Sequence, residues 1–208
     1  MKGYGIEIGG PSSYFKNYYP NIQLDNVTFA RKTIWGEFGE DYIIDGRLMG
    51  KQFIFEATDL KVNRKYDFVL SSNCIEHIAN PLKAVKEWIR VLKKGGLIVV
   101  VAPRKESNFD HRREITEFNH LVQDYENNIQ ETDLTHLPEI LELHDLPLDP
   151  PAGTFEQFTA RSLKNIENRC LHHHVFDLDL LLMTYEYFDI TPIQSTKTEK
   201  EYCLIGQI

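Results

Sequence analysis

The sequence predicts an α/β fold with a mostly parallel sheet, and the clearest evidence lies in residues 66–103. Residues 66–72 (YDFVLSS) are an apolar run typical of a buried strand. Residues 82–94 place Leu82, Val85 and Trp88 on one helical face, and Gly95-Gly96 ends that helix. Residues 97–103 (LIVVVAP) are continuously apolar, as in a strand covered on both faces. Strand, helix and strand form a βαβ unit, which favours a parallel, doubly wound sheet.

Further strands are expected on both sides of this unit. Residues 4–8, 21–24 and 52–55 are short apolar runs, each followed by turn-forming or acidic residues. Residues 188–196 and 201–208 have strand character and are joined by the charged turn KTEK. So short a connection predicts that this last pair is antiparallel.

Residues 104–171 differ in character from the rest of the chain, being polar and rich in histidine, asparagine and charge. Helices are expected at 116–127, 135–143 and 154–171, the last opening with a Thr154–Gln157 capping box. Asp177 is expected to cap a further helix. We interpret 104–171 as a helical insertion, or lid, over the carboxyl ends of the strands.

Composition narrows the function. The 208 residues carry a formal charge of −8, which opposes broad, charge-driven binding of nucleic acid. No apolar run is long enough to span a bilayer, and the N-terminal residues lack the apolar stretch of a signal peptide. Three cysteines without a CxxC motif do not suggest a disulfide framework. A cytoplasmic location is expected.

A glycine turn and three acids mark the strand ends. Gly9 and Gly10 directly follow the first strand, where a small residue lets the backbone approach a ligand. A dinucleotide fingerprint would require glycines where Pro11 and Tyr14 stand. The acids Glu7, Asp25 and Asp59 each lie beside a successive strand end.

Four segments in this order resemble class I S-adenosylmethionine-dependent methyltransferases of the methyltransferase type 11 kind: GIEIGGPSS, ATDL, YDFVLSSNCIEHIANPL and LKKGGLIVVVAP. The resemblance covers residues 4–103 well. It implies a single domain over 1–208, with a Rossmann-like seven-stranded sheet, mostly parallel, whose last strand is antiparallel. The family pattern E/D-x-G-x-G-x-G is incomplete, because Pro11 and Ser13 replace its later glycines.

The resemblance also implies the cofactor, S-adenosyl-L-methionine, with S-adenosyl-L-homocysteine as product. Asp25 would hold the ribose hydroxyls, Asp59 would accept from the adenine amino group, and Leu60 would pack nearby. The methionine end would meet the following residues: Glu7, Gly9, Gly10, Pro11, Asn73 and Cys74.

Chemistry beyond cofactor binding has fewer candidates. His77 and His111 are candidate general bases, each weighed against a purely structural role. Arg112 and Arg113 are candidates for gripping an anionic group of the acceptor, and His173 for lining its pocket. No metal site is expected, because His136, His144 and the run 172–174 lack tight ligand spacing.

The predicted function is methyl transfer to a small or medium acceptor, with oxygen slightly favoured as the acceptor atom and an anionic acceptor as one option. A nucleotide-dependent Rossmann oxidoreductase is the enzymatic alternative. A cofactor-binding regulator without catalysis is the other. The sequence does not indicate an oligomeric state.

Overall fold

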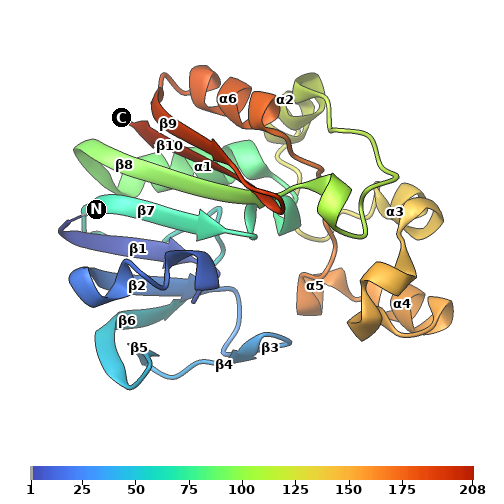
Figure 1. Cartoon of the computed structure of the whole chain (residues 1–208), viewed down its shortest axis with the longest axis horizontal. Coiled ribbons are helices and arrows are strands. Elements are labelled where there is room, and N and C mark those ends of the chain that lie inside the picture. The colour runs from blue at the N-terminus through green and yellow to red at the C-terminus, as the bar shows by residue number, and fades with distance from the viewer. Residues whose placement is uncertain (1) are drawn as a thin grey trace.

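The computed structural model describes residues 2–208 and is built on an eight-stranded sheet of order β5-β6-β2-β1-β7-β8-β10-β9 (Figure 1). The strands β6, β2, β1, β7 and β8 are parallel, and β10 is antiparallel to both β8 and β9. The strand bounds are β1 (Tyr4–Ile8), β2 (Gln23–Thr28), β5 (Asp41–Ile44), β6 (Arg47–Ile54), β7 (Tyr66–Ser72), β8 (Leu92–Pro103), β9 (Thr191–Lys197) and β10 (Glu201–Gln207).

The α/β class is confirmed, while the strand count needs a correction. Seven strands, from β6 to β9 in the sheet order, carry the expected topology, including the antiparallel β10. The eighth strand, β5, pairs antiparallel with β6 at the sheet edge. Residues 41–44 alternate exposed and buried positions, and their apolar signal is too short to stand out in the sequence.

Helices cover one face of the sheet: α1 (Pro81–Val91), α2 (Phe118–Glu126) and α6 (Leu178–Tyr187) (Figure 1). The Asn80 side chain caps α1 by accepting from the Lys83 amide, and Pro81 occupies the first turn. Trp88 is fully buried in the core beneath α1, and its indole donates to the Ala57 carbonyl. This bond ties the central helix to the loop after β6.

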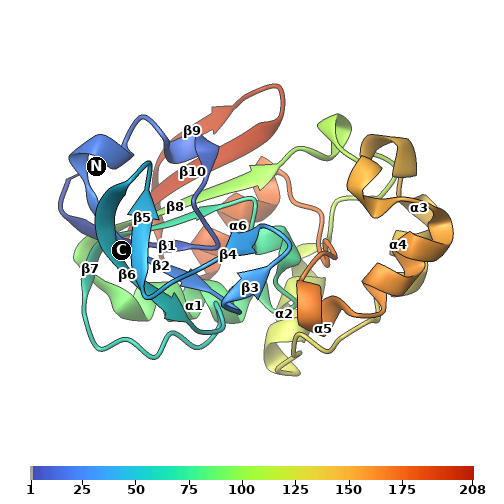
Figure 2. The same cartoon turned by 90° about the horizontal axis from the view of Figure 1, so that it is seen from below.

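The opposite face carries a smaller core under short 3-10 turns, η1 (Ser13–Phe15) and η2 (Tyr19–Asn21). Between β2 and β6 the chain forms a hairpin, β3 (Lys32–Thr33) and β4 (Gly36–Glu37), followed by β5. Figure 2 shows this hairpin reaching toward the carboxyl ends of the parallel strands.

The second predicted strand, 21–24, was placed too early. Strand β2 continues through Asp25 and Asn26 to Thr28, and both polar residues are buried within it. The Asp25 carboxylate accepts from the hydroxyls of Tyr4 and Tyr66, each at 2.7 Å, and from the Lys51 amide at 2.7 Å. These donors satisfy the charge, so an acid is tolerated inside the sheet.

The insertion contributes α3 (Leu137–Leu143), α4 (Phe155–Ser162) and α5 (Asn165–Asn168), which lie beside the carboxyl ends of the strands (Figures 1 and 2). Helix α2 instead packs against α1 and α6. The Thr154–Gln157 capping box and the Asp177 cap are confirmed. The expected helix 154–171 is divided into α4 and α5.

Among the described helices, none has the length and apolar character required to cross a membrane. Cys74, Cys170 and Cys203 are all free thiols.

Candidate active site

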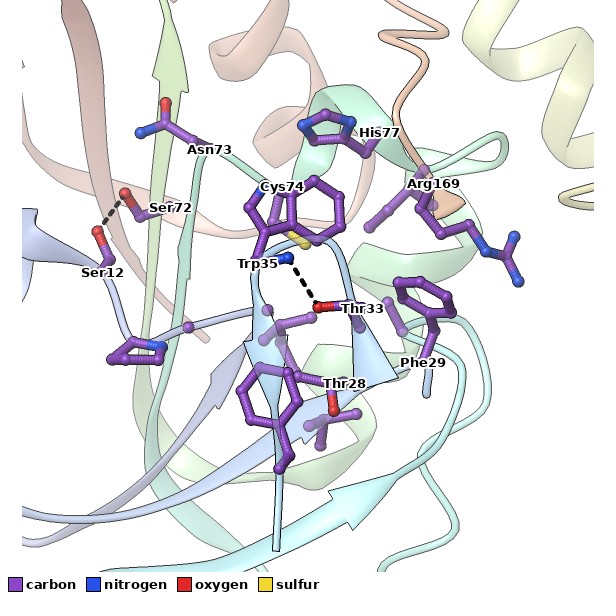
Figure 3. A pocket seen from close by; sticks show the side chains of 18 of the residues that line it. Ser12, Thr28, Phe29, Thr33, Trp35, Ser72, Asn73, Cys74, His77 and Arg169 are labelled. Atoms are coloured by element: carbon purple, nitrogen blue, oxygen red, sulfur yellow. Dashed lines mark hydrogen bonds between the residues drawn. The ribbon is translucent and has the colours of Figure 1, made fainter. Parts of the chain in front are cut away.

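A cavity of about 400 Å³ opens at the carboxyl ends of β1, β2, β6 and β7. This is the edge at which ligands of open α/β sheets bind, and the volume lies within the roughly 300–1,000 Å³ of small-molecule sites. Its walls come from the turn after β1, the ends of β2 and β6, the loop after β7, the β3–β4 hairpin and two insertion residues, Glu131 and Arg169. Figure 3 shows side chains from these segments around the cavity, Arg169 among them.

The turn after β1 is shaped by its two glycines. Gly9 adopts φ +89°, and a Cβ there would stand 3.1 Å from the Cys74 sulfur. A Cβ on Gly10 would stand 2.2 Å from the carboxyl carbon of Glu7. Ser12 Oγ donates to Ser72 Oγ at 2.8 Å, which ties this turn to the end of β7 (Figure 3). Both glycines line the cavity, and a side chain at either position would press on a neighbouring side chain.

Glu7 lies beneath this turn and does not line the cavity. Its carboxylate accepts from Tyr42 Oη at 2.7 Å, Tyr19 Oη at 2.9 Å and the Ser12 amide at 3.1 Å. Burial raises the pKa of Glu7 to about 7, although these hydrogen bonds act in the opposite direction. The side chain therefore holds the turn in shape from below.

The other predicted acids also lie away from the cavity lining. Asp25 is buried within β2, as described above. The Asp59 side chain is 64% exposed and pairs with Lys61 at 3.6 Å. Leu60 is fully buried, and its amide donates to Glu87 at 2.7 Å. Gly9, Gly10, Pro11, Asn73 and Cys74 are the predicted cofactor residues that do line it.

The acids that face the cavity are Glu56 and Glu131, and both pair with Arg169 at 2.8 Å. Arg169 follows α5 and adopts φ +54°, and its guanidinium lies 5.2 Å from the centre of the Phe29 ring. Burial raises the pKa of Glu131, and Arg169 opposes that shift. Sequence reasoning missed these residues, because no local pattern links position 169 to positions 56 and 131.

Aromatic side chains form much of the remaining wall: Phe29, Trp35, Phe38 and Phe55. Trp35 lies at the tip of the β3–β4 hairpin and is 56% exposed. Its ring meets that of His77 edge-on at 5.6 Å between centroids (Figure 3). The hairpin thus places an indole at the mouth of the cavity, opposite the loop after β7.

His77 is the one predicted catalytic residue that the structure places at the cavity. Its Nδ1 lies 3.1 Å from the Leu171 carbonyl, which can only accept, so Nδ1 carries the proton and Nε2 is the acceptor. Burial lowers the pKa of His77 well below its ordinary value, and His172 beside it acts in the same direction. His77 is therefore a neutral imidazole of fixed tautomer.

A buried polar network supports His77 from behind. His172 Nδ1 lies 2.5 Å from Asp110 Oδ2, and its ring is 4.5 Å from that of His77. Arg113 Nη1 donates to Asp110 at 3.1 Å. Burial alone would raise the pKa of Asp110, but His172 and Arg113 outweigh it and lower that pKa to about 2. Glu76, also buried, has a pKa raised to about 7 by burial.

The predicted acceptor-binding residues and His111 lie outside the cavity lining. Arg113 is buried, with donors directed at Asp110, Glu139 and the carbonyls of residues 172 and 173. His173 Nε2 lies 3.0 Å from Asn165 Nδ2 and is buried. His111 and Arg112 share Asp145, at 2.7 and 3.1 Å. These contacts hold the insertion together.

Part of the sequence and the overall fold match those of known proteins. Residues 47–100, from β6 into β8, match the model of the methyltransferase domain family. In fold, the chain is similar to an S-adenosylmethionine-dependent methyltransferase from Clostridium acetobutylicum, with a TM-score of 0.56 and 9% identity over 100% of this chain and 85% of that one. It is also similar to the N-methyltransferase NodS of Bradyrhizobium japonicum in complex with S-adenosyl-L-homocysteine (TM-score 0.53, 8% identity, 99% and 77% covered).

A possible histamine N-methyltransferase from Thermotoga maritima shares the fold as well, with a TM-score of 0.52 and 16% identity over 100% of this chain and 82% of that one. The domain match over residues 47–100 and the sheet order agree with the resemblance of the sequence to class I methyltransferases. The NodS structure holds S-adenosyl-L-homocysteine, which is the product that the sequence resemblance implies for this chain.

Proposed function

We propose that the protein transfers the methyl group of S-adenosylmethionine to a hydroxyl group of a small or medium acceptor bound in the cavity. The observation that carries this proposal is His77, a neutral histidine of fixed tautomer beside the glycine turn. A hydroxyl acceptor must lose its proton as the methyl group arrives, and a neutral imidazole within reach can take it.

The residues at the cavity fit the cofactor. Gly9 and Gly10 line the cavity and carry no side chains, so their backbone can meet the amino and carboxylate groups of the methionine end. Asn73 and Cys74 line the same side. Burial raises the pKa of the Cys74 thiol, so this sulfur stays protonated and contributes packing rather than nucleophilic chemistry.

For the nucleoside end we assign the carboxylate to Glu56. The residues that follow β2 are Phe29, Ala30 and Arg31, so none of them supplies the acid that the resemblance placed there. Glu56 follows β6, faces the cavity and is 45% exposed at its side chain. It is therefore available to accept from nucleoside hydroxyl or amino groups, in a cavity whose wall also includes the rings of Phe29 and Phe55.

S-adenosylmethionine, when bound, supplies a methyl group already activated by the sulfonium. What remains for the protein is alignment, water exclusion and removal of one proton. His77 Nε2 takes the proton of the acceptor hydroxyl. Trp35 and Phe38 exclude water from the hairpin side, and Arg169 closes the insertion side through Glu56 and Glu131. The insertion acts as a lid in this account.

Binding is tested first, by calorimetric titration with S-adenosyl-L-homocysteine and, separately, with NAD. Saturable binding of S-adenosyl-L-homocysteine is expected, without a response to NAD. Binding of NAD alone would contradict the proposal and favour the oxidoreductase.

Catalysis is tested with labelled S-adenosylmethionine against a panel of phenols, sugar hydroxyls and amines. For the hydroxyl acceptor that reacts best, His77→Asn is expected to lower kcat by about 10²–10⁴ while leaving the affinity for S-adenosyl-L-homocysteine nearly unchanged. His111→Asn is the matched control, because His111 pairs with Asp145 outside the cavity. Full activity of His77→Asn would remove the base from the mechanism, and reaction with amines alone would move the acceptor atom to nitrogen.

A further inference from the structure

Three histidines and one aspartate converge behind the wall of the cavity, and we call them the histidine cluster: His120, Asp124, His136 and His174. His120 Nε2 lies 2.9 Å from His136 Nε2 and 3.4 Å from Asp124 Oδ2. Asp124 Oδ2 also lies 2.9 Å from His174 Nε2. One nitrogen or oxygen from each residue falls within 4.8 Å of all the others.

This arrangement has the donor set and spacing of a tetrahedral metal centre. Imidazole nitrogen and carboxylate oxygen bind zinc at about 2.0–2.2 Å, which places neighbouring ligand atoms roughly 3.3–3.5 Å apart. The measured pairs, 2.9–3.4 Å, reach that spacing by moving outward a few tenths of an ångström. Without a metal, one proton lies between the facing nitrogens of His120 and His136, whereas a metal ion would engage the lone pairs of both.

The four residues come from three separate segments. His120 and Asp124 stand one turn apart on α2, His136 precedes α3, and His174 lies between α5 and α6. The insertion has a small apolar core of its own, formed by Leu137, Ile140, Ala152, Phe158 and Leu171. Small cores of this kind are commonly reinforced by a metal or a disulfide, and the three cysteines are free.

We propose that the histidine cluster binds one zinc ion, which joins the insertion to the wall of the active site. None of its four residues lines the cavity, and together they complete a four-ligand shell, as in structural rather than catalytic zinc sites. His174 is fully buried at its side chain, whereas His120 is 36% exposed and leaves a route for entry. Zinc is favoured over magnesium or calcium, which prefer oxygen ligands.

The zinc ion would also fix residues 171–174, the segment that carries His174 and contacts His77. The His174 amide lies 3.5 Å from the Glu76 carbonyl, and the Leu171 carbonyl fixes the tautomer of His77. Holding His174 therefore holds residues 171–174 against the loop after β7. The zinc ion is a positioning element for His77, and its presence does not depend on which acceptor the protein methylates.

Metal content of the full chain, prepared without a polyhistidine tag and dialysed extensively, tests this site. Mass spectrometry is expected to find about one zinc per chain, as for a structural site. His120→Ala and Asp124→Asn are each expected to lower that to below about 0.2. His111→Ala is the matched control, because His111 is 35% exposed and also bonds an aspartate within the insertion. It is expected to keep the metal.

A second measurement does not depend on recovering metal from the cell. Protein stripped with a chelator is expected to unfold at a lower temperature and to regain its Tm on addition of one equivalent of ZnCl₂. Replacement with Co²⁺ is expected to give the strong visible absorption of a tetrahedral centre. The proposal is overturned if the chain holds no stoichiometric zinc and its Tm ignores both chelator and ZnCl₂, or if His111→Ala loses metal as fully as His120→Ala.

Discussion

Replacing Glu7 by glutamine tests whether this acid is a support for the glycine turn. The folded protein raises the pKa of Glu7 from 4.5 to about 7 by burial. An acid with a raised pKa in the folded state contributes stability below its unfolded pKa of 4.5. That contribution is lost as the pH rises through 7, because deprotonation then favours the unfolded chain. Glutamine resembles the protonated form and does not titrate.

The expected size follows from this shift. Between pH 5 and pH 8 the wild-type protein loses about 2.5 kcal/mol that Glu7→Gln keeps, at 1.36 kcal/mol for each pKa unit. For a chain of this length, the Tm of Glu7→Gln relative to that of the wild type should be roughly 5–10 °C higher at pH 8 than at pH 5. Urea unfolding at the two pH values measures the difference between variant and wild type directly.

A surface glutamate provides the matched control. Glu40 is 86% exposed, so Glu40→Gln is expected to leave the pH dependence unchanged. Because Glu7 lies under the turn, its glutamine variant should also bind S-adenosyl-L-homocysteine within about threefold of wild type, a change below about 1 kcal/mol. The reasoning fails if the stability difference between Glu7→Gln and wild type is the same at pH 5 and pH 8.

Three further changes address the cavity itself. Gly10→Ala brings a Cβ to 2.2 Å from the Glu7 carboxyl; we expect a loss of about 1–3 kcal/mol in unfolding free energy and weaker calorimetric binding of S-adenosyl-L-homocysteine, and unchanged affinity would show that the turn does not contact the cofactor. Arg169→Met removes the ion pairs to both Glu56 and Glu131, so urea unfolding should show a loss of about 2–4 kcal/mol in unfolding free energy. An unfolding midpoint equal to that of the wild type would count against these ion pairs. Burial lowers the pKa of His77 below its ordinary value of 6.5. The acid limb of the pH profile of kcat/KM should therefore have an apparent pKa below 6.5, and an apparent pKa of 6.5 or above would exclude His77 as the base.

The sequence was most informative where local patterns dominate. The βαβ unit at 66–103, the antiparallel final pair and the caps at Thr154 and Asp177 all appear in the structure. One boundary was wrong: α1 ends at Val91, not at Gly95-Gly96, and β8 already begins at Leu92. Each depends on residues close together in the chain, such as an apolar run, a capping side chain or a short turn. The hairpin at 32–37 and the edge strand at 41–44 were missed, because strands of two and four residues are too short to show a periodic pattern.

The candidate site was only partly predictable for a related reason. Gly9, Gly10 and His77 stand in local motifs and reach the cavity. Asp25 looked like a turn acid, but tyrosines distant in sequence satisfy it inside β2. Arg169 acts through partners that only the folded insertion brings near.

The histidine cluster shows the same limit. His136 and His174 come together with α2 only through the path of the insertion. His172 and His174, two positions apart, have different partners in the fold, since His172 faces Asp110 while His174 faces Asp124. Spacing along the chain therefore gave no indication of a ligand set.

A crystal structure of the protein with S-adenosyl-L-homocysteine would test the central claim most directly. We predict the methionine end against the backbone of Gly9 and Gly10, the nucleoside within hydrogen-bonding distance of Glu56, and the sulfur facing the space below His77. A nucleoside bound elsewhere on the molecule, or contacting Asp25 or Asp59 in place of Glu56, would contradict this account of the site.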